Sequence, residues 1–303
     1  MTGRSNSSFT FGKAWLFLGL LLPALVFGAD YLPLRIVAGN LTSGRFQNYD
    51  DGAGARIFQG LKPDIALIQE FRSGTNTKRE IDSWVRSVFG PEFSYYREDK
   101  ELPNGIVSRY PILSSGVWPD EEMPNRDFAW ARIALPRGPT LFVVSVHLSA
   151  SKEPKRRAQT AALADYCRKN VPPGDWLVIG GDYNTQVRGE SCLRSLEKWL
   201  VIRPPWPADE DGNENTNRNR RKPTDWVLVG KELHACSTPN TLTWNGDLVF
   251  DSRVFRNLDL VPPILIEDSD AEQMQHMAVL RDFWVPIAPA APAPAPLPEV
   301  SPK

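Results

Sequence analysis

The sequence has little cysteine, little histidine and no excess of either charge. Its 303 residues contain three cysteines and three histidines, and 35 basic against 36 acidic residues give a formal net charge of −1. Cys167, Cys192 and Cys236 lack the close spacing of a zinc motif, which argues against a structural zinc site. The balanced charge gives no argument for a protein that coats nucleic acid, so any affinity for phosphate must be local.

The one long apolar run lies near the N-terminus. The first 13 residues carry Arg4 and Lys13 and no acid, and the next 14 carry no charge. Small residues near Gly28 complete a pattern typical of a secretory signal peptide. We therefore expect residues 1–28 to be a signal peptide and the protein to be secreted or periplasmic, with an uncleaved anchor as the alternative. The run is shorter than the roughly 20 residues of a membrane span, so no stable span is expected after cleavage.

Export has consequences for charge and for the cysteines. Loss of residues 1–28 would remove two positive charges and no negative ones, which shifts the formal net charge from −1 to −3. An oxidising compartment would allow at most one internal disulfide among the three cysteines and leave one thiol over. The sequence does not select a pair, and a buried free cysteine is the simpler expectation at each position.

Composition and pattern predict a globular α/β domain over residues 29–285. Hydrophobic residues make up 42% of the chain, enough for one large core or two modest ones. Short apolar runs typical of strands alternate with helical segments such as 77–89, an order that favours a layered sheet core. Residues 286–303 are rich in proline and alanine, which predicts a flexible tail.

A basic helix is expected after the apolar run 140–148. Its inner face should hold the small and aromatic residues, and its first charged residues should form a solvated turn. The inner-face residues are Ala158, Ala161, Ala162 and Tyr166, and the solvated ones are Lys155, Arg156 and Arg157.

The stretch 176–184 is the strongest candidate for chemistry. Four apolar residues are followed by Gly180-Gly181-Asp182-Tyr183-Asn184, the pattern of a buried strand that ends abruptly. Ligands bind beyond the carboxyl ends of strands in open α/β sheets. Asp182 and Asn184, two residues apart, should arrive there together. Taken alone, the stretch is more typical of a strand followed by an Asx turn, and the neighbouring motifs are what favour a catalytic role.

Other polar side chains also stand at the ends of expected strands. Asn40 lies near the end of the run 34–41, Glu70 near the end of 65–71 and His147 near the end of 140–148. A carboxylate in the apolar surroundings of Glu70 is costly unless it is paired or binds a cation. Asn40 and His147 taken singly could instead satisfy turns or structural contacts.

These residues belong to a series of motifs that resembles the endonuclease/exonuclease/phosphatase superfamily, whose members include deoxyribonuclease I. The resemblance covers roughly residues 34–285, and its strength lies in the order of the motifs. They are Asn40, Gln69-Glu70, Asn104-Gly105-Ile106-Val107-Ser108-Arg109-Tyr110-Pro111-Ile112, His147-Leu148, Gly181-Asp182-Tyr183-Asn184, Asp225-Trp226-Val227-Leu228 and Gln275-His276. The resemblance implies a deoxyribonuclease I-like four-layer α/β/β/α sandwich with a divalent-metal-dependent phosphoesterase site.

The implied chemistry suits the residue types. Hard cations such as Mg2+ or Mn2+ take oxygen ligands, which Glu70 and Asn40 would supply. Asp182 would deprotonate the attacking water, and Asn184 would hold that water or a phosphate oxygen.

The remaining catalytic residues are two histidines and a carboxylate. His147 and His276 would donate hydrogen bonds to the phosphate oxygens. Asp225 would orient His276, as carboxylates do for catalytic histidines. Arg109, ahead of a proline turn, is expected to be a surface residue or to form a structural pairing, and it stays outside this set.

One motif departs from the family pattern. Members generally carry aspartate immediately before the last histidine, and here that residue is Gln275. A neutral amide cannot supply the charge of a second carboxylate, so a weak or absent second cation site is expected. The loop 204–222 ends in a cluster of basic residues that could clamp phosphate: Arg218, Arg220, Arg221 and Lys222.

The sequence therefore predicts an exported metal-dependent phosphodiesterase. Nucleic acid is slightly favoured as substrate because of the basic loop and the aromatic residues available for stacking. The alternatives are a phosphomonoesterase or lipid phosphodiesterase acting on inositol phosphates or sphingomyelin, and a catalytically silent binding protein. No apolar hairpin for membrane docking is evident in the sequence, and no protein partner is implied.

Overall fold

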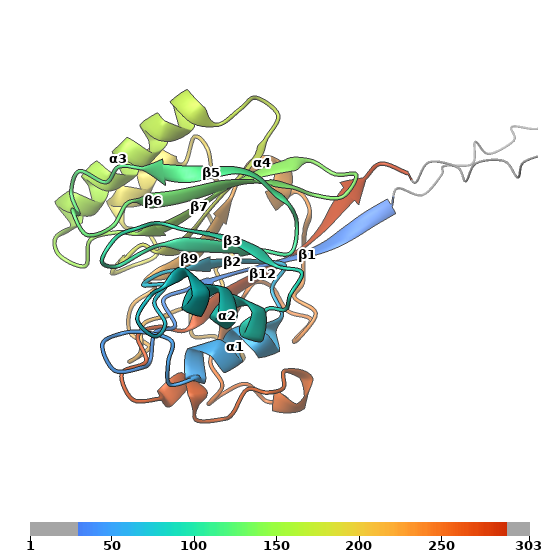
Figure 1. Ribbon diagram of the computed structural model, residues 1–303. Coiled ribbons are helices and arrows are strands. Elements are labelled where there is room, and N and C mark those ends of the chain that lie inside the picture. Colours follow the sequence, from blue (N-terminus) through green and yellow to red (C-terminus); the bar gives the residue numbers. More distant parts are fainter. Residues whose placement is uncertain (1–29, 290–303) are drawn as a thin grey trace, which may run out of the picture.

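The computed structural model describes residues 30–289, and these form two β-sheets packed face to face with helices on both outer sides (Figure 1). Three separate apolar clusters fill the space between the layers. Neighbouring strand residues alternate between clusters: Ile36 points between the sheets and Val37 points toward the outer helices. This arrangement confirms the four-layer α/β/β/α sandwich.

The first sheet has seven strands within residues 30–289. Their order is β10-β12-β1-β2-β4-β3, and β11 pairs with β12. Strand β1 is parallel to β2 and antiparallel to β12. The strands are β1 (Asp30–Gly39), β2 (Ile65–Ile68), β3 (Ser94–Arg97), β4 (Gly105–Ser108), β10 (Ser237–Thr238), β11 (Leu248–Phe250) and β12 (Ala278–Ile287).

The second sheet has five strands within the same range, in the order β5-β6-β7-β8-β9. Strands β7 and β8 are parallel, and the other neighbours are antiparallel. The strands are β5 (Ile112–Trp118), β6 (Phe128–Ala134), β7 (Thr140–His147), β8 (Trp176–Asp182) and β9 (Asp225–Val229).

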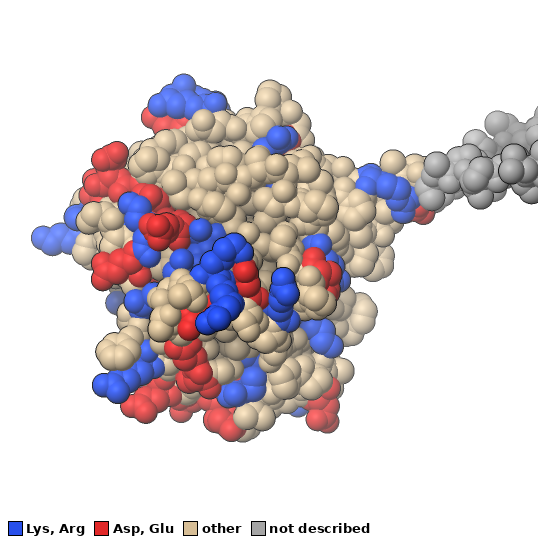
Figure 2. All heavy atoms as spheres, viewed as in Figure 1, with Lys and Arg blue, Asp and Glu red and all other residues tan. Residues whose placement is uncertain are grey.

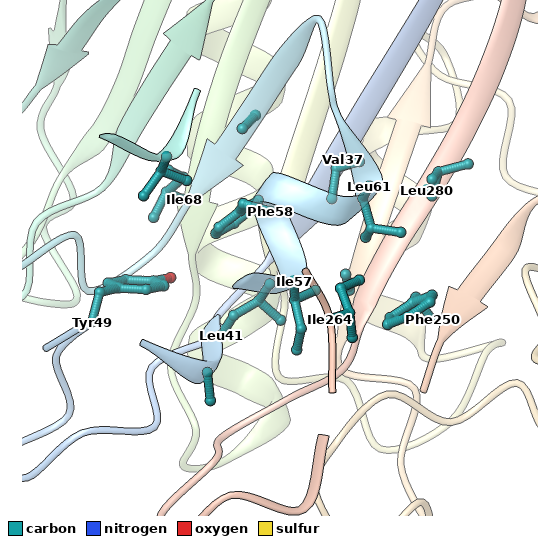
Figure 3. Packing of buried hydrophobic residues seen from close by; sticks show 14 of the residues in the cluster. Val37, Leu41, Tyr49, Ile57, Phe58, Leu61, Ile68, Phe250, Ile264 and Leu280 are labelled. Atoms are coloured by element: carbon teal, nitrogen blue, oxygen red, sulfur yellow. The ribbon is translucent and has the colours of Figure 1, made fainter. Parts of the chain in front are cut away.

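Helices cover both outer faces of the sandwich (Figure 1). Helices α1 (Ala53–Leu61) and α2 (Lys78–Val88) lie on the first sheet, and α3 (Glu153–Asn170) lies on the second. Figure 3 shows Phe58 and Leu61 of α1 among Val37, Ile68 and Leu280 of the sheet. Short helices lie in the connecting segments: η1 (Ser191–Leu196), α4 (Lys231–His234), η2 (Leu258–Leu260) and η3 (Asp268–Asp270).

Helix α2 confirms the amphipathic helix expected over 77–89. Thr77 is its N-cap and forms a capping box with Glu80, which satisfies backbone N–H groups of the first turn. The apolar side chains Ile81, Trp84 and Val88 recur at helical spacing and are buried against the first sheet.

The predicted inner face of α3 is only partly confirmed: Tyr166 packs against the core beside Trp118, but two of the alanines do not. Ala158 and Ala161 are exposed, while Gln159 and Leu163 are buried. Arg156, expected in a solvated turn, is 1% exposed, and its Nε lies 2.6 Å from Glu190 Oε1. The helix is rotated because its polar side chains find buried partners on distant segments, which an apolar pattern cannot indicate.

The C-terminal boundary of the domain also differs from the expectation. Pro286 and Ile287, assigned to the tail, continue β12 and pair with Tyr31 and Asp30 of β1. The expected signal peptide lies outside the described residues, as does the tail beyond residue 289. Among residues 30–289, no helix has the length and apolar character needed to cross a bilayer.

All three cysteines lie within the described residues, and each is a free thiol. Cys167 and Cys192 are buried, and burial raises the pKa of both thiols to about 12. Protonated, buried thiols of this kind are structural rather than reactive.

Candidate active site

Three site residues meet because neighbouring strands of the second sheet end in register. His147 is the last residue of β7 and pairs with Asp182, the last residue of β8. Asp182 in turn pairs with Asp225, the first residue of the antiparallel strand β9. Directly paired residues point to the same side of a sheet. The pairing therefore places an imidazole and two carboxylates side by side.

The first sheet contributes a second group at the same edge. Asn40 follows β1 and Glu70 lies two residues after β2, and Gly39 pairs with Ile68 in the parallel register. The Asn40 side-chain amide donates a hydrogen bond of 3.0 Å to Glu70 Oε1. Glu70 has a φ of 49°, in the left-handed region that ordinary residues rarely adopt. Such strain is concentrated at functional sites.

Hydrogen bonds join the two groups across the sandwich. The backbone N–H of Asn40 donates to Asp225 Oδ1 at 3.3 Å, and the backbone N–H of His276 donates to Asn40 O at 3.1 Å. His276 stands just ahead of β12, which pairs with β1. Side chains from position 40 to position 276 therefore converge at one edge of both sheets.

The imidazoles and carboxylates form one connected network. His276 Nδ1 lies 3.1 Å from Asp225 Oδ2 and 3.6 Å from Asp182 Oδ2. Asp182 Oδ2 also lies 3.3 Å from His147 Nε2. The Thr216 and Thr224 hydroxyls donate to the same Asp225 oxygen, Oδ2, at 2.7 and 2.8 Å. These contacts fix the His276 ring against Asp225, the arrangement expected of an orienting carboxylate.

Burial and neighbouring charge shift the pKa values of the two histidines in opposite directions. Burial, assisted by Arg126, lowers the pKa of His147 well below its usual value. Burial also acts to lower the pKa of His276, but Asp225 and Asp182 outweigh it, and the net pKa is raised. Burial raises the pKa of Asp182, against the influence of His276. At neutral pH His276 is thus the cation of the network, and Asp182 is a stronger base than an ordinary aspartate.

The end of β8 lies very close to the backbone of β7, and a tight turn follows it. Gly181 has a φ of 131°, and a Cβ there would lie 2.2 Å from the Val146 carbonyl oxygen. Asn184, with a φ of 52°, donates its backbone N–H to Asp182 Oδ1 at 2.8 Å and its side-chain amide to Leu148 O at 3.0 Å. The Gly-Gly-Asp-x-Asn stretch is therefore both an Asx turn and part of the site, so the two readings of the sequence coincide.

Two sets of donors in the site can hold a cation. Glu70 is 4% exposed, and its Oε2 has no hydrogen-bond partner, an arrangement that suits a cation-binding carboxylate. Ligand atoms of Asp182, Asp225 and His276 also lie within 4.8 Å of one another. Hydrogen bonds already engage the second set, whereas the Glu70 oxygen is free. The donors at Glu70 and Asn40 thus fit the expected hard cation, and their assignment as ligands stays a prediction.

The sequence analysis missed Arg126. This guanidinium is 4% exposed, and it donates to the carbonyl oxygens of His147, at 2.5 Å, and Leu148, at 3.1 Å. Its charge acts on both Glu70 and Asp182. Strand β6 begins two residues later and runs antiparallel to β7, so the residue before β6 must lie beside the end of β7. That pairing was the signal that could have identified Arg126.

The basic loop lies beside the site, but one of its arginines is not available to substrate. Arg220 forms ion pairs with Asp209, at 2.7 Å, and with Asp251, so it anchors the loop. Arg218, Arg221 and Lys222 are exposed. Elsewhere basic and acidic side chains are interspersed over the face seen in Figure 2. A phosphate clamp formed by the three exposed residues stays a prediction, and a role for Arg220 in it is wrong.

Residues 217–218 are paired with the segment that contains the last two motif residues. Asn217 pairs with His276, and the Arg218 N–H donates to Gln275 O at 3.0 Å. The Gln275 side-chain amide is directed to the Gln273 carbonyl at 3.0 Å. Directly opposed residues in such a pair share a face, so Arg218 stands next to the position where family members carry aspartate.

Comparison with solved structures supports the fold. The chain resembles an endonuclease/exonuclease/phosphatase family protein from Bacteroides thetaiotaomicron, with 13% identity, a TM-score of 0.60 and coverage of 85% of this chain and 96% of that one. Truncated TDP2 from Caenorhabditis elegans shows 17% identity, a TM-score of 0.53 and coverage of 83% and 98%. A functionally unknown conserved protein from Enterococcus faecalis V583 shows 12% identity and a TM-score of 0.57, with coverage of 82% of this chain and 98% of that one.

Sequence comparison identifies the family directly. No curated protein matches the sequence. The sequence pattern of the endonuclease/exonuclease/phosphatase family matches residues 48–247, which include Glu70, His147, Asp182 and Asp225. Its members are typically metal-dependent phosphoesterases. With the fold, this match shows that the chain belongs to the endonuclease/exonuclease/phosphatase family.

Proposed function

We propose that this protein is an exported, divalent-metal-dependent phosphodiesterase that cleaves nucleic acid. The main support is the convergence of Glu70, Asp182 and His276, three buried polar side chains from two sheets, at one edge of the sandwich. Buried ionisable groups are costly, and clusters of them with shifted pKa values are typical of catalytic sites. The family provides the reaction class.

In the proposed reaction Asp182 accepts a proton from the attacking water. Its raised pKa suits this task, because a base works best when its pKa approaches the operating pH. Asn184 positions the water or a phosphate oxygen. His276, held as a cation by Asp225, and His147 donate to the phosphate oxygens as charge develops on them. Water then displaces the leaving oxygen in line.

Glu70 and Asn40 would hold the cation, as the free Glu70 oxygen suggests. A bound Mg2+ or Mn2+ would supply positive charge to the phosphate oxygens. Gln275 adds no negative charge beside this site, which favours one cation over two. The proposal therefore requires one tight metal site for activity.

Two features support the substrate class and the location. Exposed Arg218, Arg221 and Lys222 border the site and suit a polyanionic chain. The basic start and apolar run of residues 1–28 support export.

Substrate assays test the proposal. Purified protein is assayed on plasmid DNA, on RNA and on methyl p-nitrophenyl phosphate, with Mg2+, with Mn2+ and with EDTA, and the Asp182→Ala protein serves as the blank. Metal-dependent cleavage of a polynucleotide is expected. Metal-dependent hydrolysis of the small diester alone would keep the phosphodiesterase and overturn the nucleic-acid substrate. A wild-type rate equal to the blank in every assay would favour the silent binding protein.

A lipid phosphodiesterase is the second candidate because three apolar side chains are exposed together. Leu260, Leu265 and Ile266 are 48%, 44% and 60% exposed, and such a loop can enter a membrane surface. The adjoining Val261 packs at Gly60, near the end of α1 and away from Asn40. Sphingomyelin vesicles in the same assays decide the matter: hydrolysis of vesicles without cleavage of polynucleotides would favour the lipid substrate.

A further inference from the structure

Phe46 projects from the loop that follows β1. Its side chain is 71% exposed, which is unusual for so large an apolar residue. The guanidinium of Arg45 lies over the ring, 4.9 Å from its centre. An aromatic ring and a cation are thus presented together to solvent.

The loop holds Phe46 in a costly backbone conformation. Phe46 and Gln47 have φ angles of 67° and 56°, in the left-handed region that is uncommon for bulky residues. Backbone bonds close the turn, including Gly44 N–H to Asn48 O at 3.1 Å. Arg72 donates to the carbonyl oxygens of Phe46 and Gln47, the latter at 2.9 Å. The exposed ring therefore stands on a braced loop, and its exposure is built into the fold.

Contacts of Thr42 and Arg72 connect the loop to the candidate cation site. The Thr42 hydroxyl donates to Asn40 Oδ1 at 2.8 Å, and Arg72 lies two residues after Glu70. The charge of Arg72 also acts on Glu70. Figure 1 shows this blue loop at the end of the sandwich where β1 ends. Phe46 consequently belongs to the rim of the proposed active site.

We propose that Phe46 is a specificity-determining residue that stacks on an unpaired nucleobase next to the phosphate being cleaved, with Arg45 beside the neighbouring phosphate. This inference rests on the proposed function. An exposed aromatic ring and an arginine are the two groups with which proteins hold single-stranded nucleic acid. Membrane insertion fits less well, because Arg45, Gln47 and Asn48 surround the ring with polar groups and leave no continuous apolar face.

Phe46→Ala tests the inference, and Trp244→Ala is the matched control. Trp244 is 75% exposed and has a φ of 59°. It belongs to the loop in which Thr241 bonds Asp282, near the far end of β1. Values of kcat/KM are measured on a single-stranded oligonucleotide and on an abasic oligonucleotide of the same length, which has no base to stack. We expect Phe46→Ala to lower kcat/KM roughly tenfold or more on the oligonucleotide that carries bases, and to leave kcat/KM on the other substrate unchanged.

The conservative variant Phe46→Trp is expected to retain oligonucleotide cleavage, and Trp244→Ala to change neither rate. Equal oligonucleotide rates for Phe46→Ala and wild type would overturn the inference and leave the proposed nuclease intact. Equal losses on both substrates would also overturn it, because the residue would then act on the site rather than on the base. A wild type that cleaves no oligonucleotide would overturn the proposed substrate as well. If Phe46→Ala bound sphingomyelin vesicles more weakly than wild type but cleaved the oligonucleotide at the wild-type rate, the inference would be overturned and Phe46 would be a membrane-contacting residue.

Discussion

At one end of the sandwich arginines neutralise the buried carboxylates, whereas at the other end carboxylates face histidines and one Glu70 oxygen faces no partner. Arg35 binds Asp282 through two nitrogens, at 2.7 and 2.8 Å. Asp64 lies 3.0 Å from Arg109, so the expected structural role of that arginine is confirmed. Glu70, Asp182 and Asp225 hold their positions at the opposite end without such pairs.

The difference shows which end is organised for stability and which for binding. A carboxylate matched by a bidentate guanidinium is satisfied and has little to offer a ligand. A buried carboxylate without that match raises the free energy of the empty fold, and a cation or a proton relieves the cost. Mutations at the catalytic end should therefore lower activity more than stability. Mutations at the paired end should lower stability and leave activity unchanged.

Asp182→Ala should have the largest effect. Loss of the proposed general base is expected to reduce kcat by about two to four orders of magnitude without unfolding the protein. Asp175→Asn is the matched control, because Asp175 stands just before the other end of β8 and pairs with Arg132 at 2.7 Å. It should keep the wild-type kcat. Metal-dependent turnover that survives Asp182→Ala unaltered would show that the base is wrongly assigned.

Arg35→Met probes the paired end. Removing the guanidinium leaves Asp282 buried without its cation, and we expect a loss of about 3 kcal/mol in the free energy of unfolding, measured with urea, with kcat unchanged. Arg137→Met is the control, because the Arg137–Asp30 pair is 42% and 50% exposed and should contribute no more than about 1 kcal/mol. Equal losses from the two variants would contradict the contrast between the ends.

Glu70→Gln should separate metal binding from stability. Burial raises the pKa of Glu70, so its charged form weakens the metal-free fold and a neutral amide does not. In EDTA we expect the variant to melt at or above the wild-type temperature. Added Mg2+ should raise the wild-type Tm and shift the variant less, because loss of the ligand weakens binding by about 10-fold or more. Equal Mg2+ shifts would exclude Glu70 as a ligand.

Glu80→Gln, at the cap of α2 and outside the network of His147, Asp182, Asp225 and His276, should have the smallest effect. Hydrogen bonds from Thr77 and Thr75 lower the pKa of Glu80 to about 2. The ionised form is therefore favoured in the fold, and its contribution is fully present above about pH 4.5 and lost as the pH falls toward 2. Wild-type Tm should fall more steeply than that of the variant between pH 5 and 2. Parallel curves would show that the cap does not titrate in this way.

The residues that sequence predicts best are those placed by local pattern. Asn40, Glu70 and Asp182 lie at or just after the ends of apolar strands, and a strand end fixes the edge of the sheet at which a side chain emerges. The resemblance then supplied the sandwich that joins them. Predicting these positions required only the strand ends and the order of the motifs.

The errors involve residues whose partners are distant in sequence. Arg126 reaches the site only through the antiparallel pairing of β6 with β7. Arg156 is buried because Glu190 accepts from it, and Arg220 is anchored by Asp209 and Asp251. A charged residue surrounded by polar neighbours looks like surface, and only tertiary pairing shows otherwise.

The pairing of Asp30 with Ile287 places the two described ends of the domain together, at the far side from Asn40 and Glu70. Figure 1 shows both strands leaving in the same direction. A tag, bead or surface attached next to Asp30 or Ile287 would thus lie on the side of the domain opposite the proposed catalytic edge. Immobilised protein should consequently remain open to long substrates.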